Sequence, residues 1–152
     1  MIRIREAMDE DADDMAEVQN AIHRAGLRPG PVDAALVRER YLVGDYRVAC
    51  TVAKQQGRVI AFQSLMRAWP DNPYGVAEGW GIIGTHVHPD AGRSGVGRRL
   101  FEKTRIAAGG AGIRHIDASI GSDNAPALAY YSAMGFMPDH ERGNAIAYRL
   151  DL

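Results

Sequence analysis

The chain has 152 residues, of which 46% are hydrophobic and 24% charged, and its net charge is −1. This is the composition of a globular domain that is long enough to bury a core. No apolar run approaches the roughly 20 residues of a membrane span, and the balanced charge gives no overall attraction to nucleic acid or anionic lipid. We therefore expect one domain over residues 1–152, with neither nucleic acid nor a membrane as a partner.

The N-terminal part of the chain predicts a strand followed by a helix. Two isoleucines alternate with arginines over residues 2–5, which is the pattern of a half-buried strand. Acidic residues then precede Met15, Val18 and Ile22, whose spacings of three and four predict an amphipathic helix. The segment RAGLRPGP, rich in proline and glycine, ends that helix.

A second short helix and a hairpin are predicted next. Asp33 is suited to cap the start of the helix, and Gly44 to end it. The β-rich runs at residues 46–53 and 58–66, joined by a polar turn, predict an antiparallel hairpin. The lone Cys50 lies in the first of these strands, where we expect a buried structural thiol. With one cysteine and no apolar leader at the N-terminus, we expect a cytoplasmic protein.

The second half of the chain alternates strands with helices after a long loop. Proline and glycine punctuate the loop at residues 67–79, and glycines also end the first of the two helices. The expected elements are a strand at 80–87, a helix at 95–108, a strand at 113–120, a helix from Asn124 to just before Gly135, and closing strands over 136–150. This order predicts a mixed α/β fold that begins largely antiparallel.

The connection between the strand at 80–87 and the next helix is the most informative segment. It reads THVHPDAGRSGVGRR and carries three glycines, although a tight turn needs only one. Arg93, Arg98 and Arg99 crowd the start of the helix, where the helix dipole disfavours cations. Unpaired backbone N–H groups and positive side chains together predict a phosphate-binding site.

Other glycine and histidine motifs are interpreted differently. GWGIIG matches the dinucleotide-binding pattern, but a strand follows it where a helix is required, so we expect close backbone approach at Gly79, Gly81 and Gly84 instead. His86 and His88 could begin a metal site, as in metal-dependent hydrolases. No carboxylate and histidine set completes the ligands, and we expect no metal.

The segment NAPALAYYSAMGF near the C-terminus, taken alone, predicts a helix with a capping asparagine and a terminal glycine. Together with the glycine-rich turn, it resembles the GNAT N-acetyltransferase superfamily. The turn fits V-x-P-x-x-R/Q-x-x-G-x-G through Val87, Pro89, Gly95 and Gly97. The later segment fits N-x-x-A-x-x-x-Y-x-x-x-G-F through Asn124, Ala127, Tyr131, Gly135 and Phe136. Gly92 departs from this pattern, because the family usually has Arg or Gln there, and the adjacent Arg93 is the substitute donor.

The resemblance implies a fold and a cofactor. The fold is a central, mostly antiparallel sheet of six to seven strands, splayed between residues 80–87 and 113–120 and flanked by about four helices. The cofactor is acetyl-CoA, with its pyrophosphate on the amides of residues 93–98 and its pantetheine beside Thr85 to Val87. The expected cofactor-binding residues are Thr85, Val87, Gly92, Arg93, Ser94, Gly95, Val96, Gly97, Arg98, Asn124 and Tyr131.

The activity implied is acetyl transfer from acetyl-CoA to a primary amine, on a small molecule or a peptide, by direct attack in a ternary complex. Tyr131 is the expected acid for the leaving thiolate. Glu78 is the first candidate for the base that deprotonates the amine, and His86 or His88 the second. The Val87 N–H is placed to stabilise the carbonyl oxygen. We also expect a homodimer, and the alternative function is a non-catalytic acetyl-CoA or CoA sensor of the same fold.

Overall fold

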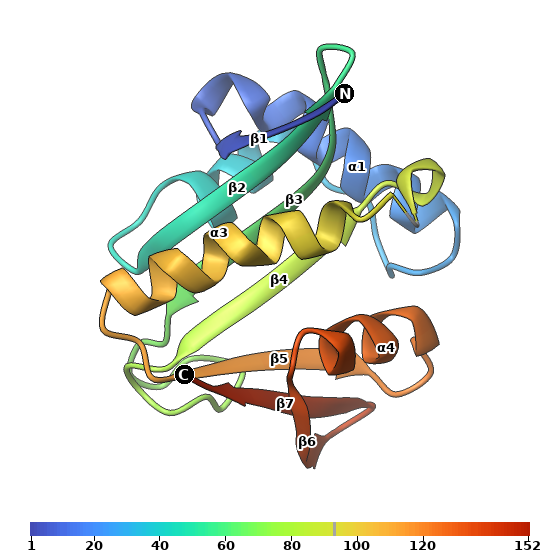
Figure 1. The fold of residues 1–152 in the computed structure, drawn as a ribbon. Coiled ribbons are helices and arrows are strands. Elements are labelled where there is room, and N and C mark those ends of the chain that lie inside the picture. Colours follow the sequence, from blue (N-terminus) through green and yellow to red (C-terminus); the bar gives the residue numbers. More distant parts are fainter. Residues whose placement is uncertain (93) are drawn as a thin grey trace.

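A seven-stranded sheet runs through the centre of the molecule in the order β1-β2-β3-β4-β5-β7-β6 (Figure 1). The computed structural model describes residues 1–92 and 94–152. All neighbouring strands are antiparallel except β4 and β5. The strands are β1 (Ile2–Glu6), β2 (Arg47–Gln55), β3 (Arg58–Arg67), β4 (Gly81–Val87), β5 (His115–Gly121), β6 (Met137–Arg142) and β7 (Ala145–Asp151).

The described part of the chain also contains four α-helices and three shorter helical turns. The α-helices are α1 (Ala12–Arg24), α2 (Ala34–Val37), α3 (Val96–Gly110) and α4 (Ala125–Ala133). The turns are η1 (Asp9–Asp11), the π-helical η2 (Arg38–Leu42) and η3 (Pro89–Ala91). No helix among residues 1–92 and 94–152 has the length and apolar character needed to cross a bilayer.

The helices cover both faces of the sheet, and the strand residues alternate accordingly. On β2, Cys50 and Val52 pack with the apolar side of α1, whereas Ala53 packs with Leu100 of α3. This is the alternation expected when both faces of a strand are buried. Figure 1 shows α3 lying across β2, β3 and β4 on one face. Cys50 is fully buried, and burial raises the pKa of its thiol to about 12, so it is the structural cysteine that the sequence predicts.

The predicted α/β order is confirmed, with two local differences. The helix expected from Asp33 to Gly44 consists of α2 followed by the π-helical turn η2, in which the Val43 N–H bonds to the Arg38 carbonyl. The helix expected to stop at Ala108 continues through the next two glycines, which have helical backbone. It ends at Gly110, and the chain turns away just beyond it at Gly112, whose φ is +73°.

The sheet splays between β4 and β5. These strands pair only at Gly81 with Ile116 and at Ile82 with Asp117. Beyond that point they separate, as Figure 1 shows. The residues of β4 from Thr85 to Val87 therefore have no partner on β5, and Thr85 contacts Tyr131 of α4 instead.

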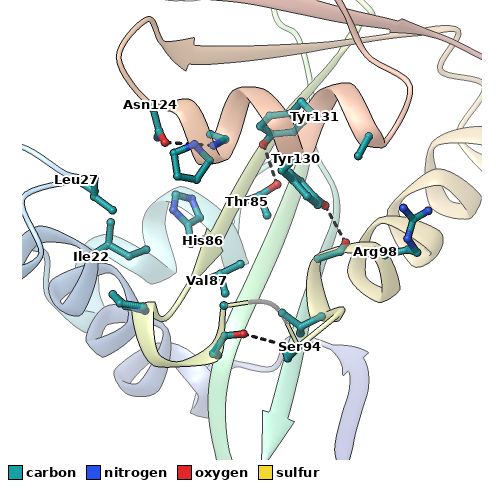
Figure 2. Close-up of a pocket in the computed structure, with 18 of the residues that line it drawn as sticks. Ile22, Leu27, Thr85, His86, Val87, Ser94, Arg98, Asn124, Tyr130 and Tyr131 are labelled. Carbon is teal, nitrogen blue, oxygen red and sulfur yellow. Dashed lines mark hydrogen bonds between the residues drawn. The ribbon is translucent and has the colours of Figure 1, made fainter.

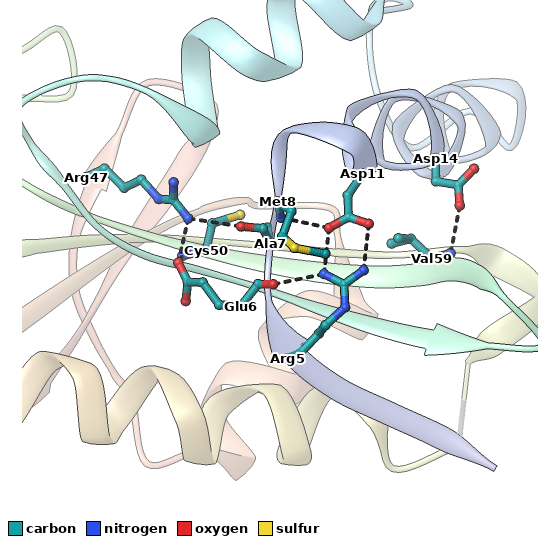
Figure 3. A network of polar contacts seen from close by, with 9 residues as sticks. All are labelled: Arg5, Glu6, Ala7, Met8, Asp11, Asp14, Arg47, Cys50 and Val59. Atoms are coloured by element: carbon teal, nitrogen blue, oxygen red, sulfur yellow. Dashed lines mark hydrogen bonds and ion pairs between the residues drawn. The ribbon is translucent and has the colours of Figure 1, made fainter.

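A polar network joins β1 and β2 to the start of α1 (Figure 3). The Arg5 guanidinium donates to both carboxylate oxygens of Asp11, at 2.7 and 2.9 Å. The same carboxylate accepts from the Met8 N–H at 2.8 Å. Asp11 is 3% exposed, so these bonds compensate for the burial of its charge. Beside it, Arg47 pairs with Glu6 and fastens β2 to β1.

Candidate functional site

A pocket of about 700 Å³ opens at the C-terminal end of β4. Its walls are the end of β4, the turn into α3, the exposed side of α4 and the loop after α1 (Figure 2). Every described residue that the sequence assigns to cofactor binding lines it: Thr85, Val87, Gly92, Ser94, Gly95, Val96, Gly97, Arg98, Asn124 and Tyr131. Arg93, also assigned there, lies outside the described residues.

The start of α3 presents unpaired backbone donors to this pocket. Gly95 caps the helix with a left-handed φ of +76°, which glycine adopts without strain. Among the described residues no side chain caps this end, and the first turn contains no acidic residue. Its first N–H groups therefore have no partner within the helix. Arg98 lines the pocket, whereas Arg99 donates to the Ile2 carbonyl of β1 at 3.0 Å.

Hydroxyl and amide groups connect β3, β4 and α4 at the centre of the pocket. Gln63 is fully buried in β3, and its Nε2 donates to Thr85 Oγ1 at 2.9 Å and to the Tyr130 hydroxyl at 3.0 Å. Thr85 Oγ1 lies 2.8 Å from the Tyr131 hydroxyl. The Tyr130 hydroxyl donates to the Gly97 carbonyl at 2.8 Å and so joins α4 to α3. These bonds are drawn in Figure 2, apart from those of Gln63.

Tyr131 is buried and stays protonated. Its side chain is 6% exposed, and its ring packs edge-on against Tyr130 and Phe136. Burial raises the pKa of Tyr131 above its ordinary value of about 10. The phenol therefore holds its proton throughout the neutral range, which is the state that a proton donor requires.

The base candidates His86 and Glu78 lie in different places. His86 lines the pocket, with its ring centroid 4.7 Å from that of Phe62. Burial, with a smaller contribution from the nearby Arg28 charge, lowers the pKa of His86 to about 3. Glu78 is exposed in the loop before β4, at the opposite end of the strand from the pocket, and is not among its lining residues.

His88 and Asn124 have local structural roles. His88 follows the end of β4 and caps η3, where its Nδ1 accepts from the Asp90 N–H at 3.1 Å. Within residues 1–92 and 94–152 no cluster of three or more His, Cys, Asp or Glu side chains is arranged around a common point. Asn124 caps α4 through its side-chain oxygen, which accepts from the Ala127 N–H at 3.2 Å.

Three residues of the site are not predicted from the sequence. Gln63 is a polar residue within an apolar strand, and buried polar groups are nearly always hydrogen-bonded, which is a usable signal. Tyr130 is adjacent to Tyr131 but points to α3. Arg28, in the loop after α1, lines the wall across from α4, and no motif marks it.

The sequence model of the acetyltransferase (GNAT) family matches residues 12–136. A relative, the S-(2-succino)cysteine N-acetyltransferase of Bacillus subtilis (strain 168), is 31% identical over 106 residues, which cover 66% of this chain. The match spans 61% of that relative's length. The chain belongs to the acetyltransferase (GNAT) family.

Solved structures share the fold. A structure of yncA from Salmonella typhimurium with its cofactor acetyl-CoA has a TM-score of 0.76 at 23% identity, and the match covers 99% of this chain and 94% of the other. The PaiA N-acetyltransferase from Thermoplasma acidophilum in complex with coenzyme A has a TM-score of 0.78 at 15% identity, with coverage of 100% and 99%. The mixed sheet with its splay is therefore the fold expected for this family.

Proposed function

We propose that this protein is an N-acetyltransferase that transfers the acetyl group of acetyl-CoA to an amine within a ternary complex. One observation carries the proposal: a single pocket contains both the uncapped start of α3 and the Thr85–Tyr131 hydroxyl pair. The first feature suits a diphosphate and the second suits proton donation to a leaving group. The named activity of the Bacillus subtilis relative supports the same reaction.

The residues present fit acetyl-CoA. The backbone N–H groups at residues 94–98 and the Arg98 side chain would hold the diphosphate. The His88 N–H bonds to β3, at the Ile60 carbonyl, and N–H directions alternate along a strand, so the Val87 and Thr85 N–H groups face the gap. These two groups would pair with an extended pantetheine arm or, at Val87, with the carbonyl oxygen. When bound, acetyl-CoA supplies an acetyl thioester.

The transfer then needs one bond to form and one to break. The amine nitrogen forms a bond to the carbonyl carbon while the carbon–sulfur bond breaks, and overall one proton passes from nitrogen to sulfur. Tyr131 donates to the leaving sulfur, and the Thr85 hydroxyl fixes the direction of the Tyr131 O–H bond. The neutral His86 ring accepts a hydrogen bond from the incoming amine.

His86 does not retain the proton. Its pKa of about 3 is far below that of an alkyl ammonium ion, about 10.4, so His86 does not take the ammonium proton, and the amine loses that proton to solvent before it attacks in neutral form. The second proton, released when the amide forms, passes to solvent, and Tyr131 regains from solvent the proton that it gives to sulfur. Glu78 is the alternative base, acting through water. We expect Glu78→Gln to keep kcat within about twofold, because Glu78 is not part of the pocket lining. A loss of a hundredfold or more in a rate assay would assign the base to Glu78.

The decisive experiment measures acetyl-CoA binding by calorimetry and thiol release with a panel of amines. The panel contains the common amino acids, their carboxamides, S-(2-succino)cysteine and spermidine. We expect saturable binding and amine-dependent thiol release. Binding without release on any amine would instead support the acetyl-CoA sensor, and no binding at low salt would exclude both functions.

Tyr131→Phe tests the role of the acid. The variant retains the buried ring and loses only the hydroxyl, so we expect acetyl-CoA affinity to be unchanged and kcat to fall about a hundredfold. Single-turnover measurements of thiol release separate this loss from slow product dissociation. Wild-type turnover in the folded variant would remove Tyr131 from the mechanism.

Three further features belong to the proposal. The whole chain acts as one domain, which is supported by a sheet that contains both β1 and β7. The protein is cytoplasmic, which is supported by its single, buried and unpaired cysteine. It forms a homodimer, which analytical ultracentrifugation tests directly.

A further inference from the structure

The wall of the pocket that faces the acetyl-transfer groups is a braced loop between α1 and α2. The Asn20 side chain donates to the Val32 carbonyl at 2.9 Å and accepts from the Val32 N–H at 2.8 Å. One turn further along α1, His23 Nδ1 lies 2.8 Å from the Arg28 carbonyl oxygen. These bonds hold the backbone of the loop at two points. Ile22 and Leu27 contribute the apolar part of this wall in Figure 2.

Arg28 is the charged residue of this wall, and no acidic side chain neutralises it within the described part of the chain. Its side chain is half-buried, it lines the pocket, and its buried Nε has no hydrogen-bond partner among the described residues. The guanidinium lies close enough for its charge to help lower the pKa of His86, after the larger effect of burial. Because this buried Nε has no hydrogen-bond partner and the charge of the half-buried guanidinium is not neutralised, a binding partner is expected for it.

The charges around the pocket are of one sign. Arg28 and Arg98 line it, and no Asp or Glu appears among its described lining residues. Arg98 belongs to the start of α3, where the cofactor phosphates are proposed to bind. Arg28 belongs to the loop after α1 and not to the start of α3, so its positive charge remains available to the acceptor.

We propose that Arg28 binds a carboxylate of the acceptor, so that the substrate is an amine that also carries an acidic group, as an amino acid does. The proposal rests on the acetyltransferase function given above. A planar guanidinium pairs with a carboxylate through two parallel hydrogen bonds, which fixes both the position and the orientation of the acceptor. A polyamine would instead place positive charge beside Arg28 and is selected against.

The test compares carboxylated amines with their carboxamides in the wild type and in Arg28→Gln. We expect wild-type kcat/KM to be about 10- to 100-fold higher for S-(2-succino)cysteine and for the better amino acids than for their α-carboxamides. Arg28→Gln removes this preference by raising KM for the acids, while kcat/KM for the carboxamides changes by less than about threefold. Arg28→Lys keeps the charge but lacks the planar guanidinium, so its preference for acids over carboxamides is expected to lie between those of the wild type and Arg28→Gln.

Arg24→Gln is the matched control. Arg24 is an exposed cation at the end of α1, paired with Glu17, and it does not line the pocket. We expect Arg24→Gln to retain the wild-type preference for acids over carboxamides. Arg24→Gln, Arg28→Gln and Arg28→Lys are all expected to bind acetyl-CoA with wild-type affinity by calorimetry.

Two results overturn the role of Arg28 while leaving the proposed function intact. One is a preference of the wild type for spermidine or for carboxamides. The other is an equal loss for acids and carboxamides in Arg28→Gln. If no amine of any class gives thiol release, the proposed function itself is overturned, and the role of Arg28 with it. The two failures are therefore distinguishable.

Discussion

Thr85 lies at the centre of the hydrogen-bonded groups in the pocket. Its oxygen accepts a hydrogen bond from the Gln63 amide nitrogen, which can only donate. The Thr85 hydroxyl hydrogen is therefore available for Tyr131, and in that arrangement the Tyr131 hydrogen points away from Thr85. A buried network of side chains can fix which hydroxyl donates and which accepts, whereas a single solvated hydroxyl can rotate freely.

We predict that Thr85→Val lowers kcat by about tenfold or more, because the methyl group preserves the volume but leaves the Tyr131 hydroxyl without a partner. Thr85→Ser restores the hydroxyl and is expected to recover most of the rate. Rate measurements at saturating acetyl-CoA give the comparison. Equal rates for the valine and serine variants would contradict the orienting role.

At the scale of residues, the sequence predicts those parts of the site whose function depends on local spacing. Gly95 and Asn124 can be expected at helix starts because caps and turns have short-range signatures, whereas the role of Tyr131 is expected only through the family resemblance. Gln63 and Arg28 reach the site only through tertiary structure, since β3 pairing and the loop after α1 place them there. No local pattern contains that information.

The start of α3 illustrates the scale of single elements. A Cβ built on Gly97 would lie 2.6 Å from Cε1 of Tyr130, so α3 and α4 approach closely only because this residue has no side chain. The close approach also lets the Tyr130 hydroxyl reach the Gly97 carbonyl. The position of α4 over the pocket thus depends on a glycine of another helix.

We predict that Gly97→Ala lowers the free energy of unfolding by about 1–3 kcal/mol through overpacking and weakens acetyl-CoA binding by displacing Tyr130. Gly109→Ala in the same helix is the control, because no atom lies within 4 Å of its built Cβ. That variant is expected to be more stable by up to about 1 kcal/mol. Denaturant unfolding and calorimetry measure the two effects. Similar shifts for both variants would contradict the packing argument.

At the scale of the whole molecule, the Arg5–Asp11 pair ties the edge of the sheet to α1. Burial alone would raise the pKa of Asp11, but hydrogen bonds from Arg5 and the Met8 N–H outweigh it and hold the pKa below its usual value. A carboxyl whose pKa is lower in the folded than in the unfolded state stabilises the fold above its unfolded pKa of about 3.9. That contribution is lost as the pH falls through the lowered folded value.

We therefore predict that Asp11→Asn costs on the order of 2–3 kcal/mol at pH 7, and that its difference from the wild type shrinks below about pH 4. Asp9→Asn is the control, since Asp9 lies in the same turn but is largely exposed in its pair with Arg38. Its cost is expected to stay below about 1 kcal/mol. Thermal unfolding from pH 3 to pH 8 gives both curves. A constant Asp11→Asn difference over that range would contradict the argument.

The order of elements over the whole molecule was predictable, because strands and helices differ in the period of their apolar residues. The splay was expected only through the family resemblance. It depends on where β4 and β5 stop pairing, after Ile82 and Asp117, and neither strand marks that point in its own pattern.

The splay gives this sheet two internal edges in addition to its two outer ones. A long thioester bound at such an edge would be held by peptide groups, whereas the acceptor is proposed to contact the Arg28 side chain on a connecting loop. Binding of the acyl donor would thus depend on backbone groups, which side-chain substitutions change little, and binding of the acceptor on a side chain, which a single substitution changes. A descendant of this protein could acquire a new amine by changing a few loop side chains and keep its acyl donor unaltered.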